Sequence, residues 1–125
     1  MNAWAYFWVF LGGGLGSICR FSLGKWLPVA NHIFPWPTFW ANLISSFILG
    51  FLVGQKLQGQ LSMQVQFLLM TGFCGGFSTF STFSYEAFAL LEDGEWTLAF
   101  LYVGGSLLVG LLAVFAGLRL SYFLA

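Results

Sequence analysis

Hydrophobic residues fill this chain in four long runs, which are separated by short segments richer in Pro, Gly, Gln and acidic residues. A helix that crosses a membrane needs about 20 mostly apolar residues. Runs of about this length or longer lie at about residues 3–24, 38–55, 61–91 and 96–124. The pattern therefore predicts an all-α integral membrane protein with four transmembrane helices in a single domain, residues 1–125.

The third run, residues 61–91, is longer than a membrane requires. As one straight helix it would reach roughly 46 Å, against a hydrocarbon core of about 30 Å. Gly72, Gly75 and Gly76 near its middle are poor helix formers, so we expect the third helix to break near residues 72–79. Irregular backbone inside a membrane is tolerated where protein buries it or where it lines a cavity. The break is therefore a candidate ion or substrate site.

Composition and charge exclude several classes of protein. Hydrophobic residues make up 59% of the 125 residues and charged residues only 6%, whereas soluble domains are about 25% charged. The net charge is zero, so the chain lacks the basic surface that nucleic-acid binding requires. With one His and two isolated Cys, no nucleophile–base pair or metal-ligand cluster can be assembled, and we do not expect an enzyme.

The basic residues are balanced between the two sides of the membrane. Four spans place Lys56 and Arg119 on the side of the termini, and Arg20 and Lys25 on the other. Orientation normally follows the excess of Lys and Arg, so this balance predicts no preferred topology. We expect molecules to insert both ways up and to pair as an antiparallel homodimer with a two-fold axis in the membrane plane. The alternative is that one orientation dominates weakly.

Polar side chains recur inside the spans at helical spacing. Asn42 could donate to an anion or bond a neighbouring helix. Tyr102 and Ser106, four residues apart, share one face of the fourth span. The third span carries a run of hydroxyls: Ser78, Thr79, Ser81, Thr82 and Ser84. Around a break, unpaired carbonyls of Gly75 or Ser78 would instead suit a hard cation such as Na⁺.

Aromatic and charged residues near the break leave alternatives open. Phe77, Phe80 and Phe83 are three residues apart, and their rings could face an anion with their positive edges or simply pack. Arg20 could attract anions into a vestibule or extend to the nearby interface. Glu86 could pair with a basic residue or shape access to the site.

Three segments together resemble the Fluc family of fluoride channels. The resemblance covers nearly all of the chain, and its third segment is long and unusual. The segments are Gly12-Gly13-Gly14-Leu15-Gly16-Ser17-Ile18-Cys19-Arg20-Phe21, Asn42 with Ser45-Ser46-Phe47-Ile48-Leu49-Gly50, and Gly72-Phe73-Cys74-Gly75-Gly76-Phe77-Ser78-Thr79-Phe80-Ser81-Thr82-Phe83-Ser84 followed by Glu86.

The resemblance implies a dual-topology homodimer with two antiparallel fluoride pores. It also implies a structural Na⁺ at the dimer interface, held by the backbone carbonyls of Gly75 and Ser78. Ser78 stands where the family usually has threonine, and Gly110 stands where its hydroxyl track often continues. The fluoride pathway implied on this chain consists of Arg20, Asn42, Phe80, Ser81, Thr82, Phe83, Tyr102 and Ser106.

The function expected from this resemblance is a passive fluoride-selective channel, a multi-pass protein of the plasma (inner) membrane that exports F⁻ from the cytoplasm and prevents fluoride toxicity. One alternative is a small proton-coupled exporter of cationic compounds. Such coupling favours a carboxylate in the first span, and no acidic residue precedes Glu86. The other alternative is a non-transporting membrane assembly subunit, in which residues 72–84 serve only helix packing.

Overall fold

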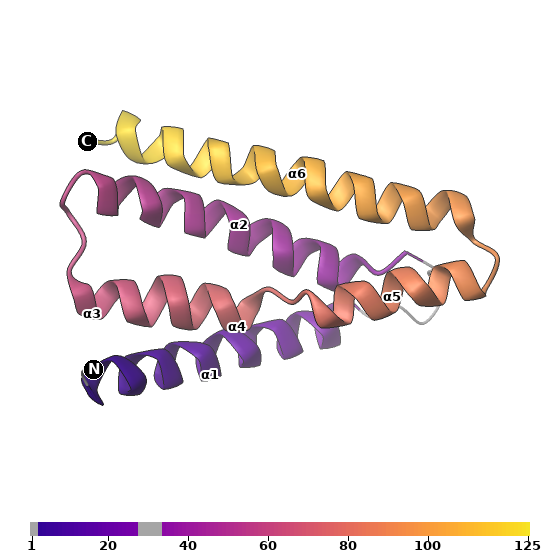
Figure 1. The fold of residues 1–125 in the computed structure, drawn as a ribbon, viewed down its shortest axis with the longest axis horizontal. Coiled ribbons are helices and arrows are strands. Elements are labelled where there is room, and N and C mark those ends of the chain that lie inside the picture. The colour runs from indigo at the N-terminus through magenta and orange to yellow at the C-terminus, as the bar shows by residue number, and fades with distance from the viewer. Residues whose placement is uncertain (1–2, 28–33) are drawn as a thin grey trace.

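The computed structural model describes residues 3–27 and 34–125, and these residues form a bundle of helices (Figure 1). The long helices are α1 (Ala3–Trp26), α2 (Trp36–Leu57) and α6 (Trp96–Phe123). Each is long and apolar enough to cross a membrane. With the interrupted third span they form four helical segments, which confirms the expected all-α architecture and is consistent with an integral membrane protein.

Local sequence explains where several helices begin and end. Helix α2 has Pro37 in its first turn, a position where proline is tolerated because its N–H is not needed. Gly59 follows α2 with φ of 71°, and Gly94 follows α5 (Ser81–Glu92) with φ of 77°. This left-handed conformation favours glycine. In Figure 1 the start of α1 and the ends of α2 and α6 lie at the same end of the bundle.

The third span is a succession of short elements: α3 (Met63–Val65), η1 (Gln66–Cys74), α4 (Gly75–Phe77) and α5. The η1 segment is π-helical. The backbone leaves the helix at Ser78, which is extended at φ −81° and ψ 161°, and becomes helical again at Ser81. The interruption thus occupies residues 78–80, at the end of the expected range and extending one residue beyond it, and the three glycines expected to unwind the helix remain helical.

Gly72 and Gly76 of the third span lie against α1 and allow the first and third spans to pack closely. A Cβ placed on Gly76 would overlap the carbonyl oxygen of Gly13, and one on Gly12 would overlap that of Leu68. Gly72 likewise lies against Gly12 and Gly13. Small residues let membrane helices approach to backbone contact. These glycines therefore serve packing against α1, and the break depends on other residues.

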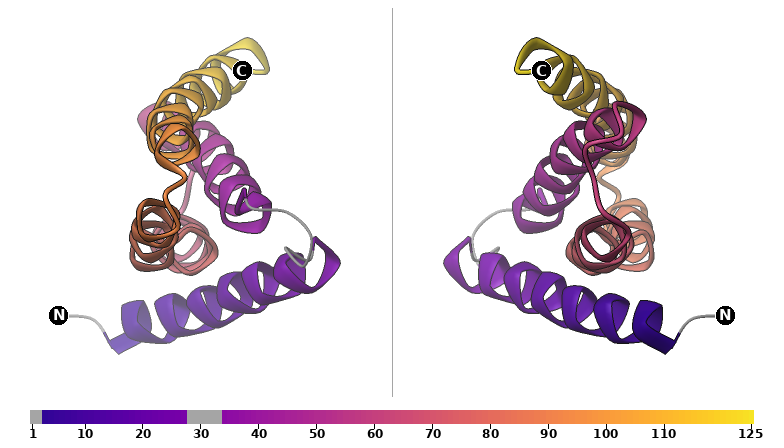
Figure 2. Two further views of the ribbon diagram at one scale, coloured as in Figure 1. Left: turned by 90° about the vertical axis from the view of Figure 1, so that its right-hand side faces the viewer. Right: turned by 90° about the vertical axis from the view of Figure 1, so that its left-hand side faces the viewer.

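Helices α2 and α6 form a second close pair. A Cβ on Gly50 would overlap the carbonyl of Val114, and one on Gly117 would overlap that of Phe47. In Figure 2 this pair lies on one side of the bundle, α1 lies obliquely on the other, and the third span runs between them. The third span is therefore in contact with helices on both sides.

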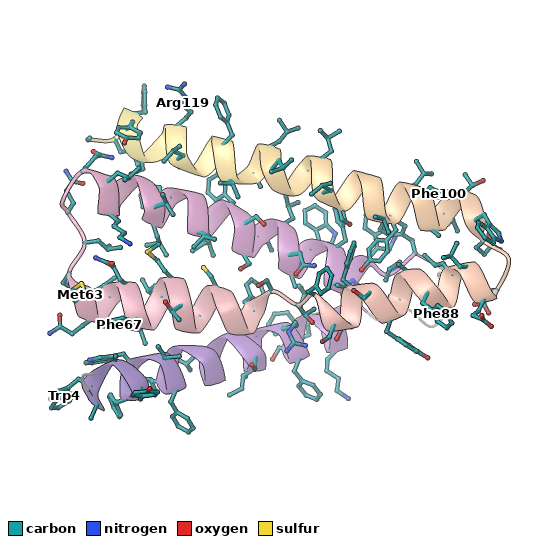
Figure 3. All side chains as sticks on the ribbon, viewed as in Figure 1. Trp4, Met63, Phe67, Phe88, Phe100 and Arg119 are labelled. Carbon is teal, nitrogen blue, oxygen red and sulfur yellow. The ribbon has the colours of Figure 1, made fainter. Side chains whose placement is uncertain are left out.

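Large apolar side chains cover the outside of the bundle. Phe88 and Phe100 point away from it (Figure 3) and are 57% and 69% exposed. Soluble monomers rarely expose apolar patches larger than a few hundred Å². This surface fits a hydrocarbon environment.

Candidate functional site

The interruption in the third span is held by one side chain from α2. Asn42 accepts a hydrogen bond from the backbone N–H of Thr79 through Oδ1, at 2.8 Å. Its Nδ2 donates to the carbonyl oxygen of the same residue, at 3.2 Å. Both backbone groups of Thr79, which lie outside any helix, are thereby paired. Unpaired backbone groups at membrane depth are costly, so Asn42 stabilises the break.

The same hydrogen bonds leave two carbonyls without their helical donors. In a continuous α-helix, Gly75 would accept from the N–H of Thr79, and Ser78 from that of Thr82. Here the Thr79 N–H donates to Asn42, and the Thr82 N–H donates to the Thr79 hydroxyl at 3.3 Å. The carbonyl oxygens of Gly75 and Ser78 are thus available in a way that regular helix would forbid. Hard cations prefer oxygen ligands of this kind.

These two residues line a small hollow of about 170 Å³ together with Ser45, Ser46, Leu49, Met70 and Cys74. In this hollow the carbonyl of Cys74 accepts from the hydroxyl of Ser45 at 3.0 Å and from that of Ser78 at 2.8 Å. The Cys74 carbonyl is therefore occupied. Gly75 is exposed, and a Cβ placed on it would meet no atom within 4 Å.

A larger groove of about 470 Å³ opens beside the break. It contains four predicted pathway residues: Asn42, Phe80, Phe83 and Ser106. Its remaining lining residues are Ser46, Ser78, Thr79, Val103 and Leu107. The Ser106 hydroxyl is buried and, within the described residues, has no hydrogen-bond partner. A buried hydroxyl without a partner is costly, so this one is available for a ligand in the groove.

A third hollow, of about 380 Å³, contains the predicted vestibule residue Arg20 together with Lys25, Thr82 and Glu86. Arg20 donates through Nε to the carbonyl of Gly76 at 3.2 Å. The guanidinium has five N–H donors, so other N–H groups remain after this bond. Two basic groups and one carboxylate thus line a hollow at the end of α1.

Tyr102 lies between the groove and this hollow. It is completely buried and lines neither. Its ring packs against Phe83 with centroids 4.9 Å apart, and its hydroxyl donates to Oε1 of Glu86 at 3.0 Å. The Tyr102 hydroxyl, which was expected to contact an ion, therefore already donates its hydrogen bond to the Glu86 carboxylate in the single chain.

Ser81 is, like Tyr102, a predicted pathway residue that lines none of the three hollows. It begins α5 and is exposed. Conversely, Ser46 and Thr79 line the groove and were not among the predicted pathway residues. The position of Ser46 four residues after Asn42 is the sequence signal that could have found it.

A family model described as "CrcB-like protein, Camphor Resistance (CrcB)" matches residues 7–118 of this chain. The chain belongs to the CrcB family. A CrcB-family relative from Thermus thermophilus, named fluoride-specific ion channel FluC, is 45% identical over 97% of this chain and 96% of its own length. Relatives with the same name from Pyrococcus abyssi and Gloeothece citriformis are 46% and 45% identical, over 97% and 90% of this chain. Their own lengths are covered to 98% and 92%.

These relatives confirm the resemblance to the Fluc family that the sequence motifs indicated. The CrcB-family match includes the break and all three hollows beside it, because every lining residue of these hollows falls within residues 7–118.

Proposed function

We propose that this CrcB-family protein is a passive, fluoride-selective channel that lets F⁻ leave the cytoplasm across the plasma membrane. The observation that carries the proposal is the groove beside the break, where the unpartnered Ser106 hydroxyl lies with Asn42, Phe80 and Phe83. Relatives about 45% identical over nearly the whole chain, named fluoride-specific ion channels, support it.

The chemistry of the groove suits a small, strongly hydrated anion. Fluoride needs several hydrogen-bond donors to replace the water that it loses, and the groove offers hydroxyl and amide donors. Aromatic edges carry partial positive charge and can face an anion without binding it as firmly as a cationic group would. Conduction requires a hold that is weak and spread over several sites. A groove of hydroxyls and phenyl rings meets that requirement.

The direction of flow follows from the acid chemistry of fluoride. HF is a weak acid that crosses membranes uncharged and dissociates in a less acidic cytoplasm. The negative membrane potential then drives F⁻ outward, since moving one charge through 100 mV is worth about 2.3 kcal/mol. A passive pore is sufficient to prevent accumulation and toxicity.

In our proposal a second chain, inserted the opposite way up, completes the pore. Phe80 lines the groove and is 81% exposed in the single chain, which supports a partner that covers it. The balance of basic residues between the two ends of the bundle supports dual insertion. The resulting antiparallel homodimer contains two pores.

A structural Na⁺ at the dimer interface belongs to the same proposal. The carbonyls of Gly75 and Ser78 have lost their helical donors, and both residues line one hollow. This oxygen donor set fits a hard cation. The role of such an ion is to hold the two breaks together.

Fluoride efflux from proteoliposomes tests the proposal directly. We expect F⁻ to leave and Cl⁻ to be retained, and we expect Phe80→Ile and Phe83→Ile to lower F⁻ efflux. Phe88→Ile is the matched control, because Phe88 points away from the bundle (Figure 3). Equal passage of Cl⁻, or undiminished flux in both groove variants, would contradict the proposal.

The dimer and its cation need separate tests. A reagent that labels a single cysteine at one end of the bundle should reach equal fractions of the molecules from the two sides of the membrane, because the two orientations are equally populated. Replacement of Na⁺ by N-methylglucamine should lower the thermal midpoint of the purified dimer. Cells lacking the protein should lose fluoride resistance, whereas an assembly subunit would leave it unchanged.

A further inference from the structure

Ser46 lines both the groove and the small hollow beside the break. One other residue, Ser78, is common to these two cavities. The Ser78 hydroxyl is already bonded to the Cys74 carbonyl, at 2.8 Å. Within the described part of the chain, the Ser46 hydroxyl has no hydrogen-bond partner. Ser46 is therefore the free hydroxyl that the two cavities share.

Ser46 also lies opposite a gap in the polar line of α6. That line runs through Tyr102 and Ser106 at four-residue spacing and reaches Gly110, which has no side chain. The Ser46 hydroxyl is 3.8 Å from the place that a Cβ of Gly110 would occupy. A hydroxyl from α2 thus stands beside the position where α6 offers none.

We propose that the Ser46 hydroxyl is a hydrogen-bond donor in the anion pathway, next after Ser106. It supplies the donor at the depth where α6 has Gly110 and no side chain. This inference rests on the proposed function. An anion that leaves the partner-free hydroxyl of Ser106 meets the partner-free hydroxyl of Ser46 in the same groove. The pathway therefore crosses from α6 to α2 at this depth.

The test moves the hydroxyl from one helix to the other. Ser46→Ala should lower fluoride efflux from proteoliposomes about tenfold, as expected for the loss of one hydrogen bond to a charged group. Gly110→Ser in the Ser46→Ala background should restore most of the flux. The added side chain has room, because the Gly110 Cβ position is in ordinary contact distance of Ser46.

Two controls separate a pathway role from a packing role. Ser84→Ala removes an exposed hydroxyl of α5 that lines none of the three hollows, and should leave flux unchanged. Each variant is first checked for the wild-type elution volume in detergent. Where Ser46→Ala fails to fold, Ser46→Thr and Ser46→Val are compared, since they are similar in shape and differ in the hydroxyl.

The possible results are distinct. Loss in Ser46→Ala with recovery in the double variant supports the inference. Wild-type flux in Ser46→Ala, or a loss that Gly110→Ser does not relieve, overturns it while the channel function stands. Absence of fluoride flux in the wild-type protein overturns the proposed function itself.

Discussion

Asn42 binds both backbone groups of Thr79, one residue that belongs to no helix. Its Oδ1 accepts the Thr79 N–H at 2.8 Å, and its Nδ2 donates to the Thr79 carbonyl at 3.2 Å. By taking the N–H that a regular helix would give to Gly75, this amide also frees the Gly75 carbonyl. One side chain from α2 therefore sets the geometry of the interruption on the third span.

Asn42→Ala should destabilise the protein and abolish most fluoride efflux. Two partly buried backbone groups of Thr79 lose their partners, and an unsatisfied buried group costs about 1–3 kcal/mol. The thermal midpoint in detergent and the efflux rate report the two effects. Gln58→Ala is the matched control: the Gln58 amide bonds the Ser121 hydroxyl at 3.1 Å, near the ends of α2 and α6. We expect it to lower the midpoint with little effect on flux. Wild-type flux in Asn42→Ala would contradict the assigned role.

Gly12→Ala should destabilise the contact between the first and third spans. The added Cβ would overlap the carbonyl of Leu68, so the helices must separate, at a cost of about 1–3 kcal/mol for overpacking. Gly14→Ala, two residues along α1, meets no atom within 4 Å and should be neutral or stabilising by up to about 1 kcal/mol. Unfolding by heat in detergent compares the two. Equal midpoints would show that the backbones are not in contact at Gly12.

Tyr102→Phe should lower stability and fluoride flux together. The phenol is completely buried and donates to Glu86, so its removal takes a donor from a charged group and costs about 1.5–3 kcal/mol. Tyr85→Phe, at a tyrosine that is 70% exposed, is the control and should behave as wild type. Thermal unfolding and efflux measure both effects. An unchanged midpoint in Tyr102→Phe would contradict the hydrogen bond to Glu86.

Ser78→Ala should keep the dependence of flux on Na⁺. In our proposal the cation binds the carbonyl of residue 78, which alanine retains, and the Cys74 carbonyl keeps its bond to Ser45. Fluoride efflux measured over a series of Na⁺ concentrations should give the wild-type half-maximal value. A shift of about tenfold, or roughly 1.4 kcal/mol of binding free energy, would instead place the hydroxyl among the ligands.

The arrangement of spans could be read from the sequence because bilayer thickness sets helix length. The runs at 3–24, 38–55 and 96–124 became α1, α2 and α6 with boundaries within a few residues. The third span was expected to be broken for the same reason, since residues 61–91 exceed what one straight crossing requires. The individual roles of the third-span glycines could not be predicted, because helix propensity takes no account of the residues that a neighbouring helix places against them.

Within the candidate site, the resemblance to the Fluc family named Asn42, Phe80, Phe83 and Ser106, and the fold brings them to one groove. Residue types and spacing alone left open whether Phe80 and Phe83 only pack and whether Asn42 only bonds a neighbouring helix. Only the tertiary structure decided that the break lies at residues 78–80, that Gly12 and Gly76 serve close packing, and that Ser46 faces Gly110. These facts depend on contacts between residues far apart in the chain. Hydrogen bonds from another helix determine where the backbone can depart from helical conformation.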